Sequence, residues 1–258
     1  MSSRSAPLWQ QAMQEEVDSL CSHAVWELCD LPPGRKALPV IWVYDLKRDA
    51  NGHVIRYKAR LVVDGRKQVK GVDYDRVFAP TSYFATVRVL LAVVNFFDYE
   101  VFQVDVKTAF LNASITEELC VQQPQGFSKD GRACRLLKSL YGLKQVARAW
   151  HERLTEQLSS VGLFPSSTES TFYCGTLQQG WVGVLVYVDD LLLVGTKPAI
   201  DTFLGNLSSA FTLSQEGEAA FSSVLRSNAT VHSVRYTSVS EGTFRTCCPD
   251  FACEIVMR

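Results

Sequence analysis

The chain has 258 residues, of which 47% are hydrophobic and 21% are charged, and its formal net charge is −1. Such a chain is long enough to bury a sizeable core, in one large domain or two lobes. A net charge this small excludes a protein that is steered to nucleic acid by its overall field, so any such binding must come from a local patch.

Apolar spacing predicts helices and strands in mixed order. Helices are expected over residues 8–22, from after Pro80 to Phe97 (buried), over 150–161 with Gly162 as its C-terminal cap, and over 198–211. Strands are expected over 40–46, 54–63, 102–106, 172–174 and 182–194. This order, with its hairpins, favours an α+β fold over a doubly wound parallel sheet.

Cysteine spacing and the N-terminus bear on the cell compartment. The eight cysteines are scattered, and no two have the Cys-x-x-Cys spacing of a zinc site. Residues 1–11 lack the apolar stretch of a signal peptide. No apolar run approaches the ~20 residues that span a bilayer. We therefore expect an intracellular protein with reduced thiols and no membrane partner.

Residues 187–190, Tyr-Val-Asp-Asp, lie between two short apolar runs, so the two carboxylates are expected at the tip of a β-hairpin. Adjacent like charges repel, and burying them is costly unless a cation neutralises them. Carboxylates held on a rigid hairpin suit Mg²⁺, which prefers oxygen ligands. The alternative is a solvated turn, since Asp is common in turns.

Asp105 lies inside a short apolar strand, where Asp is rare and costly to bury alone. Together with Asp189 and Asp190 on a neighbouring hairpin, it could hold two Mg²⁺ ions about 4 Å apart for in-line phosphoryl transfer. The alternative is an Asp at a strand end whose carboxylate accepts a hydrogen bond from a main-chain N–H.

Basic residues outnumber acidic residues between Lys47 and Lys70. Strand alternation predicts Arg56, Lys58 and Arg60 on one face of a hairpin. A row of cations of this kind fits the phosphates of a nucleotide or of a nucleic-acid backbone. An ordinary solvated face is the alternative.

Over roughly residues 8–218, the chain resembles the reverse transcriptase domain of copia-type LTR retrotransposons. The motifs that carry the resemblance, in order, are Arg56–Val62, Gly71–Tyr74, Phe78–Pro80, Asp105–Asn112, Gln123–Phe127, Leu137–Gln145 and Tyr187–Asp190. Two departures are Val146, where the family usually has Pro, and Ala113-Ser114, near which it usually has Gly.

The resemblance implies a right-hand polymerase with fingers and a ferredoxin-like palm. The chain would then consist of a helical lead-in over 1–30, fingers and palm over 31–218, and a divergent, irregular tail over 219–258 in place of a complete thumb. The implied reaction is RNA-directed DNA synthesis, in which a deoxynucleotide is transferred to a primer 3′-hydroxyl.

The resemblance also implies roles for single residues. The catalytic carboxylates would be Asp105, Asp189 and Asp190, and the same three with Val106 would form the metal site. Lys58 and Arg60 would grip the triphosphate, and Phe110 would exclude the ribose 2′-hydroxyl, with plain core packing as its alternative. The loop under template and nucleotide would contain Gly142, Lys144 and Gln145. Nucleic acid would contact Arg56, Arg66, Lys67 and Tyr187.

The implied cofactor is a pair of Mg²⁺ ions, with Mn²⁺ as a substitute. The implied partners are an RNA or DNA template with its primer, deoxynucleoside triphosphates, and other Pol polyprotein domains such as integrase, ribonuclease H and protease. The compartment would be a cytoplasmic virus-like particle, or the nucleus. Three alternatives stay open: an inactive relic that binds nucleic acid through the 47–70 hairpin, a two-metal nuclease, and a chain that misfolds at an exposed sheet edge.

Overall fold

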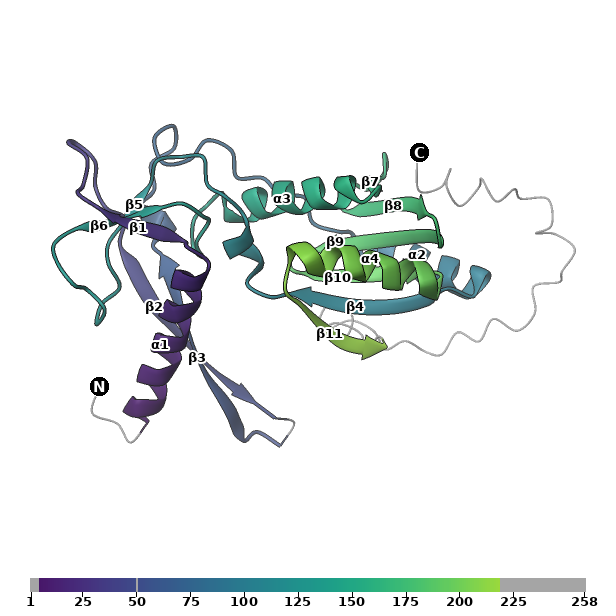
Figure 1. Ribbon diagram of the computed structural model, residues 1–258, viewed down its shortest axis with the longest axis horizontal. Helices are drawn as coiled ribbons and strands as arrows, with labels where there is room; N and C mark the ends of the chain where they lie inside the picture. Colours follow the sequence, from purple (N-terminus) through teal and green to yellow (C-terminus); the bar gives the residue numbers. More distant parts are fainter. Residues whose placement is uncertain (1–4, 50, 219–258) are drawn as a thin grey trace, which may run out of the picture. The chain divides into compact units, whose positions relative to one another are not determined.

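The computed structural model describes residues 5–49 and 51–218. These described residues form two compact units, one drawn from the range 1–79 with 108–153 (unit 1) and the other from the range 80–107 with 154–258 (unit 2). Helices and strands are mixed in both (Figure 1), as the sequence predicts. The expected irregular tail over 219–258 lies outside the described residues.

The elements follow one another with few long connections. In chain order they are α1 (Ala6–Ser22), β1 (Trp26–Cys29), β2 (Val40–Arg48), β3 (Val54–Val63), η1 (Gly65–Lys67), α2 (Phe84–Phe97), β4 (Glu100–Val106), η2 (Ala109–Asn112), β5 (Cys120–Val121), β6 (Ala133–Leu136), α3 (Val146–Ser160), β7 (Phe164–Pro165), β8 (Phe172–Leu177), β9 (Gly180–Tyr187), β10 (Asp190–Gly195), α4 (Lys197–Ala210) and β11 (Leu213–Glu218).

Unit 1 contains an antiparallel hairpin of β2 and β3 covered by α1. The turn forms because the Asp49 carboxylate accepts hydrogen bonds from the N–H groups of Asn51 and His53, and Gly52 adopts a φ of +86°. Ala12 and Met13 of α1 pack on the buried side of β3. The hairpin is therefore fixed along one face and open on the other.

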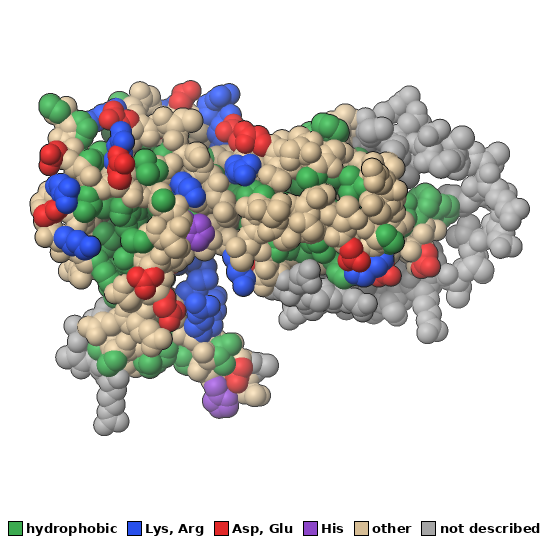
Figure 2. All heavy atoms as spheres, in the orientation of Figure 1, with side chains coloured by type: hydrophobic (Ala, Val, Ile, Leu, Met, Phe, Trp, Pro, Cys, Tyr) green, Lys and Arg blue, Asp and Glu red, His purple; other side chains and the backbone are tan. Residues whose placement is uncertain are grey.

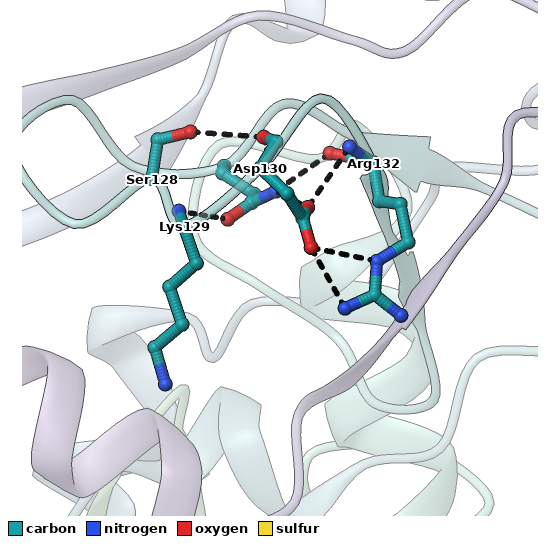
Figure 3. A network of polar contacts seen from close by, with 5 residues as sticks. Ser128, Lys129, Asp130 and Arg132 are labelled. Carbon is teal, nitrogen blue, oxygen red and sulfur yellow. Dashed lines mark hydrogen bonds and ion pairs between the residues drawn. The ribbon is translucent and has the colours of Figure 1, made fainter.

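A second sheet of unit 1 has the strand order β1-β6-β5. Gln123 lies between β5 and β6 and holds the loop that leads into β6. Figure 3 shows Ser128, Lys129, Asp130 and Arg132 of this loop. Gln123 Nε2 donates to the carboxylate and the carbonyl of Asp130 and to the carbonyl of Arg132, and its Oε1 accepts from the Lys129 N–H. A pocket of about 260 Å³ beside this loop contains none of the expected site residues.

Unit 2 is built on a six-stranded antiparallel sheet of order β11-β4-β10-β9-β8-β7. Val87 and Leu90 of α2 pack against one face of this sheet, with Leu185 and Val194. Strand alternation places Asp190 on the same face as Val194, because the two positions differ by an even number. The face of the sheet that α2 covers is therefore the face on which Asp190 lies, at the end of β10.

Most of the expected elements are confirmed, with small shifts at their ends. Gly162 caps α3 as expected: it has a φ of +88°, and its N–H donates to the Ser159 carbonyl while the Leu163 N–H donates to the Leu158 carbonyl. The expectation that α2 is buried is wrong in part. Only Val87 and Leu90 are buried, while Phe96 is 62% exposed, because one side of the helix faces the sheet.

No helix in the described part of the chain is both long and apolar enough to cross a bilayer.

Candidate active site

The carboxylates expected at the site meet in unit 2. Asp105 on β4 lies directly opposite Asp190, the first residue of β10. Both are half-buried, whereas Asp189 is exposed in the turn. The Val106 N–H donates to the Asp189 carbonyl at 2.9 Å, which ties the turn to the end of β4. Long-range strand pairing thus brings Asp105, Asp189 and Asp190 to one end of one sheet.

The turn between β9 and β10 is strained at Val188. Tyr187 pairs with Asp190, so the loop has only two residues, Val188 and Asp189. Val188 has a φ of +60°, in the left-handed region that a branched side chain strongly disfavours. A positive φ at the first loop position is typical of a type II′ turn, which prefers Gly there. Strain of this kind costs about 1–3 kcal/mol and is concentrated at functional sites.

Gln103 is a polar residue buried beside the carboxylates. It is 4% exposed, and its Nε2 donates to Asp190 Oδ1 at 3.4 Å. Its Oε1 is buried and has no hydrogen-bond partner among the described residues. A buried amide oxygen without a donor is unfavourable unless something else, such as a cation or water, satisfies it.

The oxygens at this end of the sheet suit a hard cation. Across residues 5–49 and 51–218, no three His, Cys, Asp or Glu side chains lie close enough together to hold a metal ion. Mg²⁺, however, is usually held by one or two carboxylates and completed by water and substrate phosphates. The facing pair Asp105 and Asp190, with Asp189 in the turn, fits that kind of donor set.

The cations expected on the hairpin do share one face. Arg56, Lys58 and Arg60 alternate along β3 with the buried or half-buried residues of its other face. Burial lowers the pKa of Lys58, and the nearby charges of Arg60, Lys47 and Arg56 lower it further. Figure 2 shows basic side chains gathered along this hairpin. The cations on this face therefore repel one another, and a bound anion would reduce that repulsion.

Phe110 and Arg60 both contact the ring of Tyr141, a residue that the sequence did not single out. The Phe110 ring is edge-on to the Tyr141 ring at a centroid distance of 5.5 Å. The Arg60 guanidinium carbon lies 5.8 Å from the centre of the same Tyr141 ring. Tyr141 thus joins the two in unit 1. Its position inside the Leu137–Gln145 motif was the signal that could have pointed to it.

The loop of Gly142, Lys144 and Gln145 also lies in unit 1. Gly142 is exposed with a φ of +90°, and Lys144 is exposed with its Nζ 3.3 Å from the Tyr74 hydroxyl. Gln145, in contrast, is 4% exposed. Its carboxamide is hydrogen-bonded inside the protein to Gln68 and to the Asp73 carbonyl.

The residues expected to touch nucleic acid are exposed. Arg56 Nη2 lies 3.7 Å from Glu15 Oε2, and Tyr187 is 40% exposed at the end of β9. Arg66 forms two hydrogen bonds with Asp64, of 2.7 and 3.0 Å, and this pairing raises the pKa of Arg66 and lowers that of Asp64. Lys67 is exposed beside it. These side chains are accessible, and Arg66 keeps its charge.

The family described as "Reverse transcriptase (RNA-dependent DNA polymerase)" matches residues 23–230. The chain belongs to this family. The match begins and ends later than the expected range of roughly 8–218, and it contains all the motifs from Arg56 to Asp190.

Members of the family in plants are similar to most of this chain. The chain is 39% identical over 214 residues to the "Retrovirus-related Pol polyprotein from transposon TNT 1-94" of Nicotiana tabacum, covering 81% of this chain and 16% of the relative. It is 34% identical over 215 residues to the transposon RE1 polyprotein of Arabidopsis thaliana, covering 81% of this chain and 15% of the relative. The expected copia-type kinship is confirmed, and the chain spans about one sixth of these relatives.

Among solved structures, native Prototype Foamy Virus Protease-Reverse Transcriptase is similar with a TM-score of 0.44 and 14% identity, covering 81% of this chain and 23% of that one. A foamy viral protease-reverse transcriptase in complex with double-stranded DNA has a TM-score of 0.40 and 12% identity, covering 80% of this chain and 30% of that one.

Proposed function

We propose that this chain is the fingers-and-palm part of an RNA-directed DNA polymerase from a copia-type retrotransposon. Unit 1 would supply the fingers, and unit 2 would supply a palm built on its antiparallel sheet. In the order of the chain, residues 1–30 would be a lead-in and 31–218 the fingers and palm. The observation that carries the proposal is the position of Asp105 opposite Asp190, with Asp189 in the adjoining turn.

The carboxylates would hold two Mg²⁺ ions, or Mn²⁺ in their place, with Asp105 and Asp189 as the main ligands, Asp190 assisting and Val106 contributing from the main chain. Such ions, when bound, activate an attacking hydroxyl and stabilise a leaving pyrophosphate. The protein itself holds the carboxylates in place, because β4 and β10 fix their register and Val106 anchors the turn. Gln103 orients Asp190 through the hydrogen bond from its Nε2.

Unit 1 would bind the incoming deoxynucleoside triphosphate. Lys58 and Arg60 carry the charge that matches its phosphates. Burial, and then the neighbouring cations, lower the pKa of Lys58, and a bound phosphate would favour its charged form. Phe110, held edge-on by Tyr141, presents a rigid ring against a ribose 2′-hydroxyl. Gly142 and Lys144 would lie under the template and the nucleotide.

Nucleic acid would be held mainly by its backbone. Arg56, Arg66 and Lys67 are exposed cations, and contacts of this type give binding that weakens steeply with salt. Tyr187 is exposed beside the carboxylates and offers a ring to a primer sugar or base. The template would be RNA or DNA with a primer, and the chain would work beside other Pol polyprotein domains.

The deciding experiment is extension of a labelled DNA primer on an RNA template by the full chain. Extension that requires deoxynucleotides and Mg²⁺, and that stops with a chelator, supports the proposal. Salt-sensitive binding without extension at high protein concentration identifies an inactive relic instead. Cleavage of the labelled strand without added nucleotides identifies a nuclease.

A further inference from the structure

Two segments of unit 1 that are distant in sequence, residues 63–74 and 141–145, are in main-chain contact. A Cβ added to Gly65 would lie 2.2 Å from the Gly142 carbonyl oxygen, and a Cβ added to Gly142 would lie 2.1 Å from the Val63 carbonyl oxygen. The Val63 N–H donates to the Tyr141 carbonyl at 2.7 Å. Only glycine permits an approach this close at both positions.

A chain of three side-chain hydrogen bonds fastens the same two segments. The Lys144 N–H donates to Gln68 Oε1 at 2.8 Å. Gln68 Nε2 donates to Gln145 Oε1 at 3.0 Å, and Gln145 Nε2 donates to the Asp73 carbonyl at 3.0 Å. Gln68 and Gln145 are 6% and 4% exposed, so water offers them little alternative.

The direction of this chain is fixed at both ends. A main-chain N–H can only donate, so Lys144 requires the Gln68 oxygen, and a carbonyl can only accept, so Asp73 requires the Gln145 nitrogen. The remaining pair, Gln68 Nε2 and Gln145 Oε1, is then a matched donor and acceptor. Turning either carboxamide would place two like groups together.

The segment that carries Gln68 is itself a closed turn. Asp73 Oδ2 accepts a hydrogen bond from the Val69 N–H at 2.7 Å, and the Gly71 N–H donates to the Tyr74 carbonyl at 2.8 Å. The Lys144 Nζ lies 5.0 Å from the centre of the Tyr74 ring. Asp73 and Tyr74 of the Gly71–Tyr74 motif thus contact the 141–145 loop through Gln145 and Lys144.

We propose that Gln68 and Gln145 are positioning residues that clamp the 142–145 loop for the nucleotide and template. This role rests on the proposed function. Gln145 acts through Gln68, which accepts from the Lys144 N–H, and not by touching the nucleotide, because both ends of its carboxamide are engaged inside the protein. Gln68, a buried residue beside the exposed cations Arg66 and Lys67, thereby gains a part in nucleotide binding.

The first test is amide hydrogen exchange of the full chain with Gln68→Met, which keeps the side-chain length but replaces the amide oxygen that accepts from the Lys144 N–H with a thioether sulfur, a much weaker acceptor. Exchange of the Lys144 amide should be about tenfold faster or more, as expected when a buried hydrogen bond is lost. The control is Gln10→Met on the exposed side of α1, which should leave that amide unchanged. Unchanged exchange in Gln68→Met overturns the clamp.

The second test is steady-state primer extension by the same proteins. Gln68→Met should raise KM for the deoxynucleotide about tenfold, with a smaller change in kcat, whereas Gln10→Met should change neither. The pair Gln68→Met with Gln145→Met should cost little more than either change alone, because the chain is already broken once. An unchanged KM in Gln68→Met, with faster exchange, overturns the positioning role.

Gln68→Glu separates this role from loss of packing. Its carboxylate still accepts from the Lys144 N–H, so exchange should stay slow, but it opposes Gln145 Oε1 and should raise KM. A normal KM in Gln68→Glu counts against the clamp. A wild-type chain that extends no primer overturns the proposed function, and the exchange result then decides the clamp alone.

Discussion

Asp105 and Asp190 face each other across the neighbouring strands β4 and β10. Like charges directly opposite each other in an antiparallel pair destabilise the sheet. A protein that keeps such a pair at the end of a sheet loses some stability there, which is common where charge is required for chemistry.

Asp105→Asn should therefore separate activity from stability. We expect Mg²⁺-dependent extension to fall by at least about 100-fold, the scale on which loss of one preorganised electrostatic group acts. The free energy of unfolding should stay the same or rise by about 0.5 kcal/mol, because one of two facing charges is removed. Primer extension and thermal unfolding of the same sample measure both.

The matched control for Asp105→Asn is Asp98→Asn. Asp98 is exposed in unit 2, has a φ of +55° that Asn tolerates, and should change neither property. Full activity in Asp105→Asn would remove that carboxylate from the site.

Phe110→Ala should weaken discrimination against ribonucleotides. The Phe110 ring is held edge-on by Tyr141, so its removal leaves space where a 2′-hydroxyl would lie. We expect the ratio of kcat/KM for a deoxynucleotide to that for its ribonucleotide to fall about 10- to 100-fold. Phe164→Ala, at a ring that is 60% exposed in unit 2, serves as the control. An unchanged ratio would leave Phe110 as a packing residue.

Glu169 should make unit 2 sensitive to acid. Burial raises the pKa of Glu169, but hydrogen bonds from Thr171, Thr86 and the Tyr83 N–H outweigh it and hold the pKa below its usual range. Because the folded pKa is lowered, the carboxylate stabilises the fold above the unfolded pKa, and this stabilisation is lost as pH falls through the folded value. Glu169→Gln should cost about 1.5–3 kcal/mol at pH 7.

Urea unfolding of wild type and Glu169→Gln from pH 7 to pH 3 checks this. The difference between them should shrink below the ordinary Glu pKa of 4.5. Glu100→Gln, at an exposed carboxylate on β4, should show no such trend. A difference that grows as pH falls would mean that the sign is wrong.

Gly142→Ala should destabilise unit 1 by at least about 2 kcal/mol. Its φ of +90° disfavours any Cβ, and the new atom would lie 2.1 Å from the Val63 carbonyl oxygen. Gly131→Ala is the contrasting change, because nothing lies within 4 Å of a Cβ at that position. Chemical unfolding of both variants gives the comparison, and equal stabilities would contradict the close approach.

Local patterns in the sequence were sufficient for the hairpins. The β9–β10 turn and the alternating face of β3 follow from period-two spacing, which depends only on neighbours along the chain. The pairing of β4 with β10 could not be read in this way, because Asp105 and Asp190 are distant in sequence. Shifting the register by one residue would have moved Asp105 to the other face.

Side-chain partners across the fold were also beyond local patterns. Tyr141 and Gln68 lie in or beside quoted motifs, but their importance comes from contacts with Arg60 and Gln145 that require the tertiary fold. Gln103 could have been noticed, since a polar residue inside an apolar strand calls for a partner. The exposed side of α2 was missed because a helix that is apolar all round is normally buried.

β11 has a practical consequence for anyone who shortens this chain. It pairs along the side of β4 that faces away from β10, with Ser214 opposite Asp105. A fragment that stopped before Leu213 would leave β4 with a row of open main-chain donors and acceptors, ready to recruit a strand from another molecule. Such a fragment should aggregate from the side that carries its carboxylates, so a soluble recombinant product needs residues up to at least Glu218.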